Sequence, residues 1–221
     1  MEGKLIVIEG ASDGIGKTTQ FIMLKERLLN ENIEVITHHF PSYNTSEGIM
    51  VEEYLKGKFG NINDLSPYFI NSLYAVDRAA TWIKTLKKEY ESGKVILLDR
   101  YTTSSLIYQS ALIESDEEKK KFIDYVNEYE YIKLGIKKPD KVIFLNAPFE
   151  LISELRNKRI GNDGILKDIH ESDNSFMKKV SDNAQMVSKY LNWDIINCEE
   201  NNQFRKIEDI HEEIYKLIKK M

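Results

Sequence analysis

The chain has 221 residues and a formal net charge of −5, and 42% of its residues are hydrophobic while 30% are charged. This composition is that of a globular domain, its acidic balance argues against nucleic acid as the main partner, and its apolar runs are shorter than the roughly 20 residues that cross a membrane. The first residues lack the layout of a signal peptide, so we expect one cytoplasmic domain over residues 1–221 with no membrane partner. The single cysteine, Cys198, cannot form an internal disulfide, and we expect it to pack in the core.

Short apolar runs rich in β-branched residues recur along the chain and predict strands that are buried on both faces. Longer segments with helical spacing separate these runs, so strands and helices alternate. Right-handed crossovers between such units produce a parallel sheet covered by helices. The predicted strands are Leu5–Ile8, Ile33–Ile36, Val95–Leu98, Val142–Leu145 and Trp193–Ile196.

Two helices carry clear boundary signals. Ser66 and Pro67 have the residue types of an N-cap and a first-turn proline, and Gly93 ends the helix that we expect to run from Ser66 to Glu91. The segment from Lys206 to Met221 carries isoleucine and leucine on one face, which predicts an amphipathic final helix. No linker or repeat interrupts the chain, in agreement with a single domain.

A glycine-rich loop follows the first predicted strand. Gly16, Lys17 and Thr18 match the end of the phosphate-binding pattern G-x-x-x-x-G-K-[ST], but Ala11 occupies the first-glycine position, so the loop is one residue longer than the pattern. We expect the extra residue to bulge between Glu9 and Asp13, away from the phosphates. The alternative is a glycine-rich turn without a ligand, but a cation at a helix N-terminus is unfavourable unless an anion is present, which favours nucleotide binding.

An acid and an arginine end the third predicted strand. Asp99 lies at the carboxyl edge of a strand that we expect beside the loop, where a carboxylate can hold Mg²⁺ through water. Arg100 follows it and can bind a second phosphate. The alternative, a surface ion pair, does not account for their place at a strand end.

At the residues that begin with Asp99, the chain resembles the thymidylate kinase family. The resemblance extends from about residue 3 to residue 218, and its most specific part is the string that begins at Asp99. It implies an α/β, three-layer P-loop kinase fold with a five-stranded parallel sheet flanked by helices. It also implies that the protein phosphorylates dTMP to dTDP with ATP and Mg²⁺. The matching segments are Glu9–Gln20, Phe40–Pro41, Tyr74–Arg78, Asp99–Gln109, Lys138–Leu145 and Leu191–Trp193.

The resemblance also implies roles for particular residues. Thr18 and Asp99 are assigned to Mg²⁺, and Asp13, Lys17 and Arg100 to the transfer of the phosphoryl group. Tyr74 corresponds to an aromatic that stacks on thymine, and a helical spacing puts Arg78, which reads the carbonyl edge of the base, on the same face. Tyr108 is expected to lie where the 2′-hydroxyl of a ribonucleotide would otherwise fit. The expected ATP-binding residues are Gly14, Ile15, Gly16, Lys17, Thr18, Thr19 and Arg156, and the expected acceptor-binding residues are Asp13, Phe40, Pro41, Tyr74, Arg78, Arg100, Ser104, Ser105, Tyr108 and Gln109.

Two departures from the family pattern affect positions that contact phosphate groups in the family. Tyr43 stands where family members of the eukaryotic kind have an arginine that contacts the acceptor phosphate, so one phosphate contact is in doubt. The loop also lacks their P-loop arginine. Its function is assigned instead to Arg156 and Arg159, in a segment of about 156–170 that resembles the lid of bacterial-type members. A basic helix end that merely complements the helix dipole is the alternative for these arginines.

The expected reaction needs no covalent intermediate. An oxygen of the acceptor phosphate, whose second pKa is near ~6, is already largely ionised at neutral pH and attacks the γ-phosphoryl group directly. A nucleoside kinase, a kinase for another monophosphate, and a P-loop regulatory module without phosphotransfer remain as alternatives. The resemblance also implies a homodimer built from helix faces.

Overall fold

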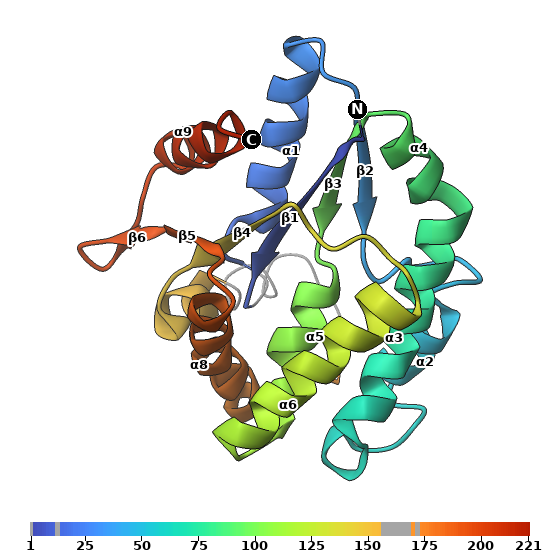
Figure 1. Cartoon of the computed structure of the whole chain (residues 1–221). Helices are drawn as coiled ribbons and strands as arrows, with labels where there is room; N and C mark the ends of the chain where they lie inside the picture. The colour runs from blue at the N-terminus through green and yellow to red at the C-terminus, as the bar shows by residue number, and fades with distance from the viewer. Residues whose placement is uncertain (1, 12–13, 156–168, 171–172) are drawn as a thin grey trace.

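Five parallel strands form the central sheet of the computed structural model, which describes residues 2–11, 14–155, 169–170 and 173–221. The strand order is β2-β3-β1-β4-β5, and helices cover the sheet, so the expected three-layer α/β fold is confirmed (Figure 1). The strands of this sheet are β1 (Lys4–Gly10), β2 (Val35–His39), β3 (Val95–Asp99), β4 (Lys141–Asn146) and β5 (Asp194–Asn197).

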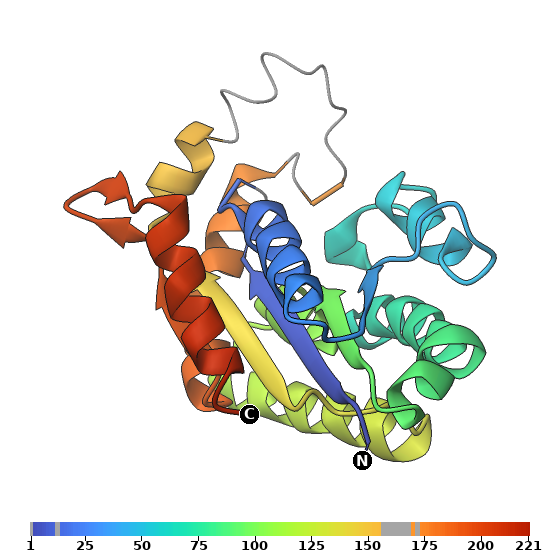
Figure 2. The same cartoon turned by 90° about the horizontal axis from the view of Figure 1, so that it is seen from above.

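The central strand β1 is apolar on both faces, as a strand between two helical layers must be. Ile6 and Ile8 pack with Leu24 of α1 (Lys17–Asn30) and with residues of α9 (Ile207–Ile218). Because side chains alternate along a strand, Leu5 and Val7 point to the other face, which packs against the long helix described next. Figure 2 shows α1 and α6 (Asp116–Asn127) on opposite sides of the central strands.

One long helical stretch begins at Ser66, whose hydroxyl accepts a hydrogen bond from the Tyr68 amide and caps the helix. It comprises α3 (Pro67–Thr81), a π-helical turn η2 (Trp82–Leu86) and α4 (Lys87–Glu91). The predicted helix from Ser66 to Glu91 is therefore confirmed, while the π turn has no counterpart in the prediction. The predicted C-terminal helix is confirmed as α9.

Further helices and short elements complete the fold. Residues 149–155 are also helical. No helix within the described residues is long and apolar enough to cross a bilayer. The remaining elements are α2 (Ile49–Leu55), η1 (Ile62–Asp64), α5 (Thr102–Tyr108), η3 (Ser110–Leu112), the π-helical turn η4 (Glu128–Lys133), α8 (Asn174–Tyr190), β6 (Glu199–Glu200) and β7 (Gln203–Phe204).

Two local predictions differ from the structure. The second strand starts at Val35 rather than Ile33, because Asn32 has a φ of 61° and the chain is still turning away from α1. It continues to His39, because β2 stays paired with β3 up to the end of β3, where His39 lies opposite Asp99. The hairpin β6–β7 was not predicted, since its tight turn at Asn201 and Asn202, both with positive φ, joins strands without an apolar pattern.

Candidate active site

The site begins where β1 and β3 end side by side. The register pairs Ile8 with Asp99, so the glycine-rich loop that follows β1 starts next to the carboxylate at the end of β3. The loop leads into α1, where Gly16 takes the N-cap position with a φ of 91° and no side chain among the described residues caps the helix. A φ of this sign favours glycine. The first amides of α1 are therefore available to an anion, as at other helix N-termini that bind phosphate.

Lys17 and Asp99 form a buried ion pair at this edge. The Lys17 Nζ lies 2.7 Å from Asp99 Oδ1, and His39 Nδ1 lies 3.2 Å from Asp99 Oδ2. Burial disfavours the ionised form of Asp99, but the hydrogen bond from His39 and the charges of Lys17 and Arg100 outweigh it and hold the pKa of this carboxyl well below its usual range. Asp99 is therefore an anion that can attract a metal ion or orient the lysine.

Two of the three residues between Glu9 and Asp13, where we expected a bulge, are held in place by the fold. Gly10 still pairs with Leu145 in the sheet, and Ala11 is 4% exposed and packs in the core. The Tyr108 hydroxyl donates a 2.9 Å hydrogen bond to the Ala11 carbonyl. An outward bulge at Gly10 or Ala11 is therefore wrong, because strand pairing and this hydrogen bond hold both residues inward. Ser12 and Asp13 lie outside the described residues.

The other expected ATP-binding residues that the structure describes occupy the loop and the first turn of α1. Gly14 and Gly16 have positive φ angles, and Ile15 is buried in the core, so only its backbone is available to a ligand. Thr18 is exposed and Thr19 half-buried. The expected catalytic arginines Arg156 and Arg159 lie outside the described residues, as does most of the expected lid.

A cavity of about 200 Å³ lies beside this loop. The cavity brings together nine of the residues expected to bind the acceptor, and five further residues complete it. The expected residues in its lining are Phe40, Pro41, Tyr74, Arg78, Arg100, Ser104, Ser105, Tyr108 and Gln109, and the others are His39, Tyr43, Leu55, Tyr101 and His170.

Arg78 lines the cavity and forms a fully buried ion pair. Its guanidinium donates to both oxygens of Glu130, at 2.7 Å each, and its Cζ lies 5.9 Å from the ring centroid of Tyr74. Burial lowers the pKa of Arg78, but the charge and hydrogen bonds of Glu130 more than compensate and raise it. Tyr74 and Arg78 line the same cavity one helical turn apart on α3, as the spacing predicted.

Arg100 takes a left-handed backbone conformation with a φ of 66°, which costs a non-glycine residue of order 1–3 kcal/mol and is frequent at functional sites. Its Nη1 lies 3.5 Å from the Tyr108 hydroxyl and 3.6 Å from Glu9 Oε1. Glu9 is completely buried and accepts hydrogen bonds from Thr103 Oγ1 and Ser104 Oγ at 2.7 and 2.6 Å. Glu9 thus connects the end of β1 to the helix that carries the acceptor-site residues.

His170 covers another part of the cavity. It is 5% exposed, its Nε2 lies 2.7 Å from the Tyr54 hydroxyl, and its ring stacks on Tyr108 at 5.5 Å. The neighbouring Ile169 amide donates to the Leu55 carbonyl at 3.2 Å. Residues 169–170, at the end of the expected lid segment, are therefore attached to α2 beside the acceptor cavity.

Sequence reasoning gave no site role to Glu9 or Glu130, and it included His170 only as the last residue of the expected lid segment. Glu9 carried a signal, because an acid within a strand that is buried on both faces must be paired. Glu130 carried none, because it stands among tyrosines and acids in a segment without a motif. Only the tertiary structure brings it to Arg78.

The comparisons with known proteins agree on one family. The family model described as thymidylate kinase matches residues 8–214. The thymidylate kinase of Thermoanaerobacter sp. (strain X514) is 35% identical over 159 residues, which cover 72% of this chain and 73% of that protein. That of Plasmodium falciparum (isolate 3D7) is 30% identical over 222 residues, covering 100% of this chain and 91% of that protein. A solved thymidylate kinase structure from Candida albicans superposes with a TM-score of 0.72 at 23% identity, over 99% of this chain and 92% of that one.

Proposed function

The chain belongs to the thymidylate kinase family, and we infer from this membership and from its site that it is a phosphotransferase that converts dTMP to dTDP. The observation that carries the inference is the position of the buried Lys17–Asp99 pair beside the cavity that contains Arg100. A phosphate-binding loop next to a cavity lined by two arginines and several aromatic side chains provides for a donor and an acceptor at adjacent positions.

We propose ATP as the phosphoryl donor. The amides of the loop and of the first turn of α1, together with the Lys17 ammonium, suit a triphosphate, since each offers a donor to phosphate oxygens. The arginines of the expected lid, Arg156 and Arg159, would complete the charge on the γ-phosphoryl group. Their role follows from the family resemblance.

We propose Mg²⁺ as the accompanying ion. The Thr18 hydroxyl is exposed, and the Asp99 carboxylate lies at the same edge of the sheet, so the oxygen donors fit a hard ion that takes one or two protein ligands and the rest from phosphates and water. When bound, the ion would neutralise charge on the transferred group. Within the described residues no cluster of three or more histidine, cysteine or acidic side chains forms a separate metal site.

In the acceptor cavity we propose that Tyr74 stacks on the thymine ring and that Arg78 donates to a base carbonyl. Arg100 would bind the acceptor phosphate, held by its left-handed backbone and by its approach to Glu9. The Tyr108 ring would exclude a 2′-hydroxyl. Phe40, Pro41, Ser104, Ser105 and Gln109 would complete the pocket.

The chain's part in the reaction is positioning and electrostatic stabilisation. An acceptor phosphate oxygen, already ionised, needs no general base. Lys17 would follow the charge that develops on the transferred group, and Arg100 would hold the attacking oxygen in line. Tyr43 can hydrogen-bond but cannot supply the charge of the arginine found at its position in family members of the eukaryotic kind, so Arg100 carries more of the acceptor contact.

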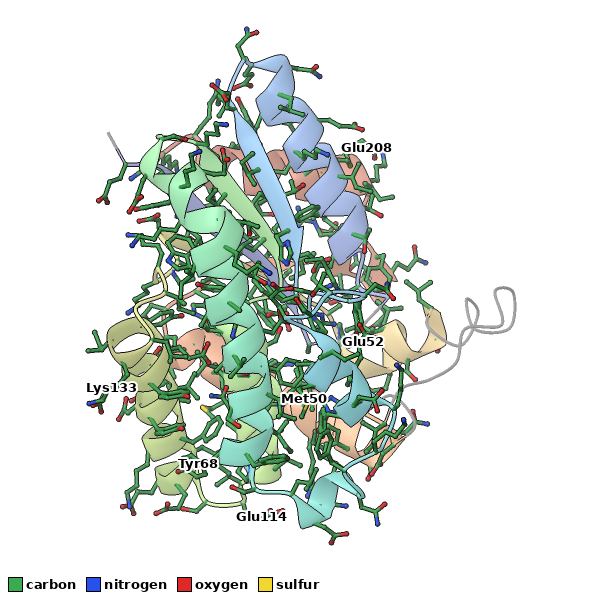
Figure 3. All side chains as sticks on the ribbon, turned by 90° about the vertical axis from the view of Figure 1, so that its right-hand side faces the viewer. Met50, Glu52, Tyr68, Glu114, Lys133 and Glu208 are labelled. Carbon is green, nitrogen blue, oxygen red and sulfur yellow. The ribbon has the colours of Figure 1, made fainter. Side chains whose placement is uncertain are left out.

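We also propose a cytoplasmic homodimer. Phe69, Val76 and Ile83 recur every seven residues along the long helical stretch and are 39%, 58% and 66% exposed. Figure 3 shows the side of the molecule on which α3 and α2 lie, with Tyr68 labelled near the start of α3 and Met50 on α2. An exposed apolar stripe of this spacing suits a two-fold contact between helices.

The proposal is tested by measuring ADP release with ATP and Mg²⁺ for a panel of acceptors: dTMP, dUMP, UMP, dCMP and thymidine. The proposed function predicts the highest kcat/KM with dTMP. Turnover with thymidine but not with dTMP would contradict it and identify a nucleoside kinase. ATP binding without acceptor-dependent release would identify a regulatory module.

A further inference from the structure

Glu130 is a buried acid that no step of the proposed reaction uses. It lies on the π-helical turn η4, 52 residues after Arg78 in sequence, and the two side chains are 0% and 1% exposed. A fully buried ion pair is costly, because desolvation of two charges offsets most of their attraction. Such a pair is therefore poor evidence of stabilisation and calls for another explanation.

The hydrogen bonds of Arg78 leave few donors unused. A guanidinium has five N–H groups. Nε and Nη2 donate to the two oxygens of Glu130 at 2.7 Å, and Nη2 also lies 2.9 Å from Ser105 Oγ and 3.3 Å from Asn71 Oδ1. Nη1 donates to the Tyr101 carbonyl at 3.3 Å. The second N–H of Nη1 has no partner among the residues that the structure describes.

The paired contact with Glu130 also removes rotational freedom. Two parallel hydrogen bonds between a planar carboxylate and the Nε–Nη2 edge of a guanidinium fix the plane as well as the position of the arginine. A single hydrogen bond would leave the arginine free to rotate about it. Because Arg78 lines the cavity, this plane sets the direction from which a base can be contacted.

We propose that Glu130 is a positioning residue for base recognition: it holds Arg78 so that one N–H of Nη1 remains for a carbonyl of the base. This inference rests on the proposed function, and it deepens it. Arg78 offers only donors, so thymine and uracil, which present a carbonyl oxygen at position 4, are accepted. Cytosine presents an amino group at position 4 instead. This group is also a donor, so it would face the N–H of Arg78 and neither group would have a hydrogen-bond acceptor.

The experiment compares four full-length proteins: wild type, Glu130→Asp, Glu130→Gln and the matched control Glu128→Gln. Asp keeps the charge but withdraws the carboxylate by one methylene, while Gln removes the charge at nearly the same volume. Glu128 lies on the same turn, but its side chain is 63% exposed. KM and kcat are measured for dTMP and dCMP, and KM for ATP, after thermal unfolding has established that each protein is folded.

The proposal predicts that KM for dTMP rises tenfold or more in both Glu130 variants, while kcat and KM for ATP stay within about twofold. The preference for dTMP over dCMP then falls by a similar factor, and Glu128→Gln behaves as wild type. A folded Glu130 variant with wild-type KM for dTMP would overturn the proposal. So would parallel changes in kcat and in KM for ATP, since these would indicate a general structural effect.

A double variant keeps the test decisive if a single variant does not fold. Arg78→Met with Glu130→Leu removes both charges, and replacing a buried ion pair by apolar residues is often tolerated. It should fold and lose the preference for dTMP over dCMP; retention of that preference would overturn the inference. Wild type itself separates the two claims. If it does not phosphorylate dTMP, the proposed function fails, and the inference fails with it before any variant is compared.

Discussion

The hydroxyl of Tyr108 donates a hydrogen bond to the backbone carbonyl of Ala11, so a residue of the acceptor cavity holds the start of the phosphate-binding loop. The two residues are 97 positions apart in sequence. Ala11 occupies the place where the loop departs from the usual pattern by one residue. The contact therefore explains how a longer loop can remain seated against the site.

Tyr108→Phe tests this contact, because it keeps the ring and removes only the hydroxyl. We expect the free energy of unfolding to fall by about 1–3 kcal/mol, since the buried Ala11 carbonyl loses its partner. KM for ATP should rise severalfold. The preference for deoxyribonucleotide over ribonucleotide acceptors should persist, because the ring remains. Tyr190→Phe, at a 44% exposed position, is the control. An unchanged KM for ATP would mean that the hydroxyl does not position the loop.

Lys17→Met removes the only lysine that the structure places at Asp99. We expect kcat/KM for dTMP to fall by about 10²–10³, the usual loss when one preorganised donor to a developing negative charge is removed. The steady-state rate is measured at saturating ATP with varied dTMP. Lys25→Met, two turns further along α1, should retain wild-type activity. Activity within tenfold of wild type in the Lys17 variant would remove this lysine from the mechanism.

Val76→Glu and Ile83→Glu test the proposed dimer. Both side chains are more than half exposed in the monomer, so a charge there should change its stability by less than about 0.5 kcal/mol. In a dimer the same charge would be buried without a partner and would oppose association. Sedimentation velocity should detect a dimer for wild type and for the control Ile22→Glu, and a monomer for the two variants. Dimeric variants would exclude this stripe as the interface.

Stability should depend on the titration of His38. Burial lowers the pKa of His38 from its ordinary value of 6.5, and the nearby charge of Asp77 offsets only part of this effect. Because the folded pKa is depressed, the unfolded chain takes up the proton first as the pH falls. The corresponding stability is therefore present above about pH 6.5 and is lost as the pH falls through the folded-state pKa.

The check is the free energy of unfolding in urea at pH 7.5 and pH 5.5. His38→Gln, which can still reach the hydroxyl of Ser42, should lose less stability between these pH values than wild type. The difference between the two proteins isolates His38, because other titrating groups, including His211, are common to both. Equal losses would show that His38 does not contribute.

Local signals predicted the strands and the helix that begins at Ser66. Hydrophobic runs and a capping serine act over a few residues, so they can be read without knowledge of the fold. The cavity residues were found because the family motifs carry them, and the parallel topology then brings the ends of β1 and β3 together. The same topological argument could have predicted that Glu9, near the end of β1, belongs to the site.

The pairing of Arg78 with Glu130 could not be predicted. It depends on how η4 packs against α3, and on a π-helical turn that hydrophobic periodicity does not indicate. The inward position of Ala11 had the same origin, since a hydrogen bond from Tyr108 decided it. Contacts across long sequence separations, rather than local propensities, determine these parts of the site.

The most direct test of the central claim is the fate of the γ-phosphate. The protein is incubated with γ-labelled ATP, Mg²⁺ and dTMP, and the nucleotides are separated. Phosphoryl transfer at this site predicts labelled dTDP in equal amount to the ADP formed, and Arg100→Met should lose most of it. Labelled inorganic phosphate alone, or no labelled dTDP from a wild-type protein that binds both nucleotides, would contradict the assignment.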